Sequence, residues 1–267
     1  MKFSLIATLC LVVNVINAQE LYVATEPASN MAAQSIAVRL NNTVMHNSRL
    51  GTMYRLNPEV MWGVNKKLML HANGYFSNIH QQHINGEGVS TYAKYRFLSV
   101  DNNHSHFRMA LYGKAALINN KLQYHEINLS GDNSGLGAGL VATQLLHKLA
   151  MSFTGGYAKA LNNSHDKLII GAPNYGVNYS LSFGYLLLPT KYKTFNDPNF
   201  NVYVEFMGKN NPQEKTSFVD VFPAVQLIVR SNMRIDVGYR KQLVGNMLRV
   251  NNQELFVRFE YTFFNAY

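Results

Sequence analysis

Cysteine is nearly absent from this chain. The one cysteine, Cys10, lies inside a short apolar run close to the N-terminus. A single thiol excludes a disulfide framework, and it also excludes zinc sites built from several thiolates. If the N-terminal run is a cleaved leader, no thiol remains, and cysteine nucleophiles are excluded as well.

Charge is scarce, and negative charge most of all. Charged residues make up 15% of the sequence, whereas soluble domains carry about 25%. The 24 basic residues exceed the 15 acidic ones, giving a formal net charge of +9. A basic balance can indicate nucleic acid, but an exported protein rarely meets it. We therefore expect no nucleic-acid partner, and favour outer-membrane lipid, lipopolysaccharide phosphates or a small anionic solute.

Long hydrophobic runs are missing beyond the N-terminus, so no segment has the roughly 20 apolar residues of a membrane-spanning helix. The N-terminus itself has the three parts of a secretory signal peptide. Lys2 is the positive start, residues 3–16 are mostly apolar, and Asn17-Ala18 is a small-residue cleavage site. We predict that residues 1–18 are a signal peptide. Cleavage before Cys10, as in a lipoprotein, would leave an unusually short apolar region.

The chain instead contains segments in which apolar and polar residues alternate with a period of two. The clearest case is residues 54–64, YRLNPEVMWGV. One parity reads Tyr, Leu, Pro, Val, Trp, Val, and the other reads Arg, Asn, Glu, Met, Gly. Because successive side chains of a strand point to opposite faces, this segment predicts a strand with one apolar and one polar face.

The same period recurs along the chain and predicts about twelve strands, give or take two. The predicted strands are 35–45, 54–64, 68–76, 89–97, 107–117, 135–146, 149–160, 177–187, 201–209, 218–229, 234–240 and 253–264. Most have close to the 9–11 residues that a tilted strand needs to cross a bilayer. A soluble sandwich also alternates, so the connections and the last strand must decide between the two folds.

The connections favour a membrane barrel. Tight turns, as at Asn65-Lys66-Lys67 and His147-Lys148, alternate with longer polar loops, although 189–200 is a long exception. The last strand carries aromatic residues on one parity and the chain ends on Tyr267, which resembles the signal read by the barrel-assembly machinery. We therefore predict an all-β fold in the outer membrane, a closed antiparallel transmembrane β-barrel over residues 35–267 with both termini in the periplasm.

Two features interrupt the pattern. Residues 19–34 do not alternate, and they could fold inward as a plug or stay in the periplasm. Pro58 and Pro223 sit on the apolar parity of predicted strands. Since proline cannot donate to a sheet ladder, each predicts a bulge or a strand end.

One hairpin resembles a known family. Residues 57–60 (NPEV), 65–68 (NKKL) and Gly74-Tyr75 are similar to a recurring hairpin of the family named for the MetA pathway of phenol degradation. A fainter copy begins at Pro223-Ala224-Val225 and ends at Gly238-Tyr239, and the pattern continues through most of the mature chain. The resemblance implies an outer-membrane barrel with a channel or transporter role, and it implies no particular substrate.

The polar parity supplies the candidate lumen residues. Those most expected to set selectivity are Arg55, Glu59, Lys94, Arg96, Arg108, Lys114, Arg240, Arg258 and Glu260. Adding Lys209, Arg234, Glu205, Asp220 and Asp236 gives nine basic and five acidic residues. A lumen of this balance would concentrate anions. The other interpretation is structural, because small barrels fill their interior with paired charges.

Three function classes follow. The leading hypothesis is a channel or transporter for a small, anionic or amphipathic solute. The second is a structural or surface-interaction barrel with a closed lumen. The third is an outer-membrane lipid hydrolase, suggested by His46-Asn47-Ser48, but this pair falls in a predicted loop, so we do not expect an enzyme.

Other motifs indicate no cofactor. The histidine pairs His80/His83 and His104/His106 fall on opposite sides of the membrane in this topology, so neither reaches a third metal ligand. The glycine-rich stretch 135–139 does not open a helix after a strand, so it is no dinucleotide loop. Small residues in a barrel strand instead indicate curvature or close packing.

Overall fold

The computed structural model describes residues 22–47, 51–79, 83–120, 124–161, 174–190, 194 and 197–267. The predicted signal peptide, together with Ser48 and His80, lies outside these ranges. Within them, no helix is long and apolar enough to cross a membrane.

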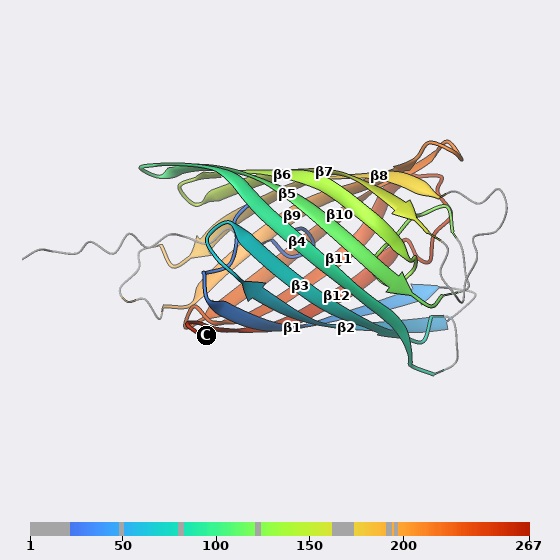
Figure 1. Ribbon diagram of the computed structural model, residues 1–267, viewed down its shortest axis with the longest axis horizontal. Helices are drawn as coiled ribbons and strands as arrows, with labels where there is room; N and C mark the ends of the chain where they lie inside the picture. The colour runs from blue at the N-terminus through green and yellow to red at the C-terminus, as the bar shows by residue number, and fades with distance from the viewer. Residues whose placement is uncertain are drawn as a thin grey trace, which may run out of the picture.

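The described residues form twelve antiparallel strands in one closed barrel (Figure 1). The strands are β1 (Ser35–Asn47), β2 (Gly51–Gly63), β3 (Leu68–Ser77), β4 (Asn85–Asn102), β5 (Ser105–Ile118), β6 (Gly135–Leu146), β7 (Leu149–Ala160), β8 (Tyr175–Leu188), β9 (Asn199–Asn211), β10 (Thr216–Val229), β11 (Met233–Gly245) and β12 (Gln253–Phe263). Each strand pairs with its neighbour in the chain, and β1 pairs with β12 to close the sheet. The predicted fold class is confirmed.

The period-two pattern gives the barrel a polar interior and an apolar outer surface. In β10, Asp220 and Gln226 face inward and are fully buried, whereas Val225 and Leu227 face outward and are 40% and 37% exposed. An apolar outer wall around a polar interior is the arrangement that lets a barrel sit in hydrocarbon. Closure of the sheet leaves no unpaired edge, which lipid could not hydrogen-bond.

The two prolines behave differently from the prediction of a bulge or strand end. Pro58 and Pro223 lie inside β2 and β10, and the strand register continues unchanged across both. At Pro58 the missing N–H is replaced locally, because the side-chain amide of Asn57 donates to Gly74 O at 2.7 Å. The prediction was wrong because each ladder skips the proline and the residue before it on one side only, toward β3 at Pro58 and toward β11 at Pro223, and then resumes in the same register.

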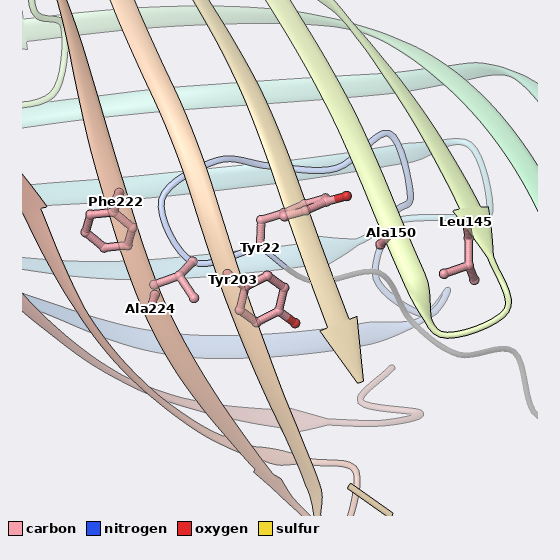
Figure 2. Packing of buried hydrophobic residues seen from close by; sticks show 7 residues of the cluster. Tyr22, Leu145, Ala150, Tyr203, Phe222 and Ala224 are labelled. Carbon is pink, nitrogen blue, oxygen red and sulfur yellow. The ribbon is translucent and has the colours of Figure 1, made fainter. Parts of the chain in front are cut away.

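Residues 22–34, which we call the inner segment, run inside the barrel wall. Figure 2 shows Tyr22 beside Tyr203, with ring centroids 5.8 Å apart, and near Phe222 and Ala224 of β10. Tyr22 and its neighbour Val23 are 2% and 0% exposed. The inner segment is therefore packed as core, near the end of the barrel at which the C-terminus lies (Figure 1).

The opposite end is covered by two connections, residues 124–134 and 246–252, which we call the loop cap. Ile127 and Leu129 of the first and Met247 and Val250 of the second are each less than a tenth exposed. The N–H of His125 donates to Leu248 O at 3.0 Å, so the two connections are joined. We name the two ends the termini end and the loop end. In outer-membrane barrels short turns are periplasmic and longer loops extracellular.

Candidate solute chamber

A chamber of about 500 Å³ lies in the lumen between the inner segment and the loop cap. Residues 23–26 form its floor and residues 126–130 its roof. Pockets for small molecules span roughly 300–1,000 Å³. The lumen therefore contains a chamber of ligand size between two covered ends.

The chamber wall carries side chains of both charges, and the basic residues outnumber the acidic ones. Its six basic residues are Arg39, Arg55, Lys114, Lys209, Arg240 and Arg258, and its four acidic residues are Glu26, Glu59, Glu126 and Glu254. Carboxylates outside the chamber lining offset part of this surplus, for example Asp132 beside Arg55 and Asp236 beside Arg258, so the effect of each cation depends on its own partners.

Lys114 differs from the other five cations. Each of those lies within 4.0 Å of a carboxylate, for example Lys209 with Glu126 at 2.6 Å and Arg240 with Glu254 at 2.8 Å. The Lys114 Nζ donates to Ser130 Oγ at 2.6 Å and has no carboxylate within 4.0 Å among the described residues. Lys114 is therefore the cation that a bound anion could neutralise.

An aromatic surface runs along the inner wall from β3 to β5. The rings of His71 and Tyr92 have centroids 4.9 Å apart, and those of Tyr92 and Tyr112 are 5.5 Å apart and within 25° of parallel. Tyr92 is paired across the strands with Lys114 on one side and His71 on the other. The unneutralised cation thus lies beside the aromatic surface.

Glycines let Tyr112 lie flat against the wall. A Cβ at Gly139 would come within 2.6 Å of the Tyr112 ring, and one at Gly156 within 2.1 Å of its hydroxyl oxygen. The amide of Asn178 donates to that hydroxyl at 3.2 Å and fixes the far edge of the ring. The glycine-rich stretch singled out in the sequence thus provides the close packing expected of it.

The structure places five of the nine predicted lumen residues on the chamber: Arg55, Glu59, Lys114, Arg240 and Arg258. Glu260 lies nearer the termini end, where it bonds Arg39 at 2.6 Å. Arg96 lies at the rim of the termini end, and its guanidinium donates to Lys66 O at 2.7 Å.

Lys94 and Arg108 hold the inner segment. The Lys94 Nζ is fully buried and donates to Pro27 O at 2.6 Å and Ser29 O at 2.8 Å. Arg108 donates to Ser29 Oγ at 2.7 Å. These two cations therefore contact protein groups of the inner segment and do not line the chamber.

Glu205 makes the densest contact with the inner segment. Its Oε1 accepts the N–H groups of Val23 and Ala24 at 3.0 and 2.7 Å, and its Oε2 accepts that of Thr25 at 2.9 Å. The hydroxyls of Thr25 and Ser182 add two further donors. A fully buried carboxylate with this many donors needs no cation to balance it.

Arg258 holds the same stretch from the other side, because it donates to Val23 O. Arg39 bonds Glu26 Oε1 at 3.0 Å. Burial alone would raise the pKa of Glu26, but the positive charges of Arg39 and Lys94 outweigh it and hold the pKa well below its usual range. Glu26 is therefore ionised in the floor of the chamber.

The loop cap is held mostly by ion pairs. Arg55 contacts Asp132 at 2.5 Å, and Arg249 binds Asp220 with two bonds of 2.6 and 2.7 Å. Lys209 pairs with Glu126 from the wall. Burial opposes ionisation of Glu126, but the charges of Lys209 and Arg240 win, and its pKa is lowered.

Sequence reasoning missed several of these residues. Arg39 lies on the inward parity of β1, and the order Val38, Arg39, Leu40, Asn41 carried the signal, weakened by the polar Asn42 that follows. Arg249 comes from a loop and bonds a strand residue 29 positions away, so no local pattern predicts it.

A closed barrel with an apolar outer wall and a charged lumen defines the class: this chain is an outer-membrane β-barrel protein. A crystal structure of an outer membrane channel from Pseudomonas putida F1 is similar to it, with a TM-score of 0.56 over 91% of this chain and 100% of that one, at 9% identity. The KdgM porin and the β domain of the Bordetella autotransporter BrkA also match, with TM-scores of 0.45 and 0.47 and identities of 12% and 11%. Both matches cover 86% of this chain and 99% of the other.

No family model matches the chain. No curated protein matches it either. The similarity to solved structures therefore supports the fold alone. The function has to be inferred from the residues of the chamber.

Proposed function

We propose that this outer-membrane barrel passes a small anionic solute through the chamber. The observation that carries the proposal is Lys114, a chamber cation that no described carboxylate neutralises. An anion at Lys114 gains a charge-assisted hydrogen bond without breaking an ion pair. The architecture shared with an outer membrane channel supports the same role, as does the resemblance to the family named for the MetA pathway of phenol degradation, to which we propose the chain belongs.

Transport through this lumen proceeds by release of one end at a time. The solute enters when the loop cap moves and leaves when the inner segment moves, since residues 126–130 and 23–26 bound the chamber. A narrow, intermittently open path of this kind gives small and brief conductance steps.

The test is the reversal potential of the purified protein in planar bilayers under a salt gradient. We expect an anion preference, and Lys114→Glu should shift the reversal potential toward cations. The matched control is Lys159→Glu, because Lys159 is exposed and is paired with the outward-facing Leu136 of β6, so it should leave selectivity unchanged. An unchanged reversal potential in Lys114→Glu would refute the role of Lys114.

A second candidate function is a structural or surface-interaction barrel with a permanently closed lumen. The contacts that cover both ends favour it. It predicts a silent bilayer even for a variant in which the inner segment has been released. We further propose that the barrel is no lipid hydrolase, since His46 Nδ1 lies 3.4 Å from the hydroxyl of Thr52 and no carboxylate of the described residues bonds that nitrogen to orient the ring as a base.

A further inference from the structure

We propose that the chamber binds an anionic sugar, a single hydroxylated ring with a carboxylate. The ring packs against the aromatic surface that His71, Tyr92 and Tyr112 form, and the carboxylate binds the ammonium of Lys114. The inference rests on the proposed function, which it deepens by naming the class of solute.

The first argument is the position of Lys114 relative to the rings. Tyr92 and Lys114 are direct cross-strand partners, and such partners have Cβ atoms about 4.5–5.5 Å apart. One small molecule can therefore touch a ring face and the ammonium together. A sugar ring presents C–H groups to an aromatic face, and a uronic acid carries its carboxylate on the edge of that ring.

The second argument is unused hydrogen-bonding capacity around the aromatic surface. The side chains of Asn73, Thr154 and Ser180 line the chamber and make no side-chain hydrogen bond to other described residues. The Nε2 atom of His71 is buried and has no partner among them, while Nδ1 lies 2.5 Å from Glu59 Oε1. A polyhydroxylated ring offers hydrogen-bond partners to groups of this kind.

The third argument excludes the aromatic acids, which share the ring and the charge. A site for an apolar ring is lined predominantly by apolar side chains with few polar ones. This chamber also contains Asn73, Thr154 and Ser180, and an apolar ring would leave the amide and hydroxyls of these three side chains unpaired at a cost for each. Polar groups placed to bond hydroxyls reject an analogue that lacks them.

The test is isothermal titration of the detergent-solubilised barrel with D-glucuronate, D-glucose and benzoate. We expect saturable binding of D-glucuronate that is at least tenfold tighter than that of either other compound. Lys114→Met should bring D-glucuronate to the level of D-glucose, a loss of roughly tenfold from one charge-assisted bond. Tyr92→Leu should weaken both sugars about equally, while Tyr95→Leu, on the outward face of the same strand, is the control.

Heat-modifiable electrophoretic mobility checks that each variant is folded, and Lys114→Arg, which keeps the charge, should retain the preference for D-glucuronate. Benzoate binding tighter than D-glucuronate would overturn the inference, and so would an equal affinity for D-glucose and D-glucuronate in the unmodified protein. If the barrel conducts anions but binds no sugar, this inference fails and the proposed channel stands. If it binds D-glucuronate yet no variant conducts, the proposed channel fails instead.

Discussion

At the termini end the barrel wall bonds mainly the backbone of the inner segment, whereas at the loop end ion pairs between side chains add to backbone bonds such as that from His125 N–H to Leu248 O. Glu205, Lys94 and Arg258 bond the N–H and C=O groups of the inner segment. The loop cap depends on ion pairs such as Arg55–Asp132 and Arg249–Asp220. The two covers of one chamber are thus built from different chemistry.

This difference indicates which end of the barrel opens more easily. Several bonds to neighbouring backbone groups must break together for the inner segment to leave, and Glu205, Lys94 and Arg258 would lose their partners at the same time. The ion pairs of the loop end join separate side chains and can break one at a time, and the most exposed of them, Lys209–Glu126, is also weakened by salt. The loop cap is therefore the easier end to open, and the inner segment is the main barrier.

The largest expected effect comes from Glu205→Gln, which removes the negative charge and keeps one oxygen as acceptor for the Val23 and Ala24 N–H groups, but presents an amide N–H₂ to the donors that Oε2 accepts, among them the N–H of Thr25. The inner segment should be released. We expect conductance in planar bilayers to rise about tenfold, and amide exchange in residues 22–34 to accelerate, because charged hydrogen bonds contribute about 1.5–3 kcal/mol each.

The control is Glu214→Gln, since Glu214 lies exposed between β9 and β10 and carries the same chemical change. If Glu205→Gln leaves both conductance and exchange as they were, the inner segment is not the main barrier. The proposed difference between the two ends would then be wrong.

The fold was predictable because lipid and lumen impose a simple rule on every strand. Residues 54–64 show it, since each outward position must be apolar and each inward one tolerates charge. Twelve strands and the barrel followed from that rule. It fixes which parity faces inward, and so Arg55, Glu59 and Lys114 could be named as lumen residues from the sequence.

The contacts of the inner segment and of the loop cap could not be predicted from a period-two pattern. The inner segment is held through backbone atoms, which every residue has, so no side-chain signal marks residues 22–25 as the partners of Glu205. The partners of Arg249 and Glu126 come from strands far away in the chain. Whether an inward cation lines the chamber, as Lys114 does, or holds the inner segment, as Lys94 does, depends on three-dimensional contacts alone.

A smaller effect is expected at the loop end from Arg249→Met. It would leave the fully buried carboxylate of Asp220 with Arg240 at 3.7 Å as its nearest cation. Removing one partner of a buried ion pair costs about 3–5 kcal/mol. We expect the midpoint of urea unfolding to fall and proteolysis to reach residues 246–252, while conductance rises less than in Glu205→Gln.

Arg230→Met is the matched control, because Arg230 lies exposed in a turn. The double variant Arg249→Met with Asp220→Asn should recover part of the loss, since it leaves no buried charge unpaired. A conductance increase larger than that of Glu205→Gln would reverse the order of the two barriers.

The smallest expected effect tests whether the inner segment is held by many separate bonds or by Glu205 alone. Thr143 Oγ1 accepts the N–H of Ala28 at 2.9 Å, and Thr143→Val removes that acceptor with little change of shape. One neutral hydrogen bond contributes about 1 kcal/mol, so exchange of the Ala28 amide should accelerate roughly fivefold, with conductance almost unchanged. Thr91→Val is the control, since Thr91 is exposed on β4 and its hydroxyl bonds no described side chain. Exchange that spreads through residues 22–34 in Thr143→Val would show that the inner segment is released as one unit, and the backbone bonds would then act cooperatively and not as separate contributions.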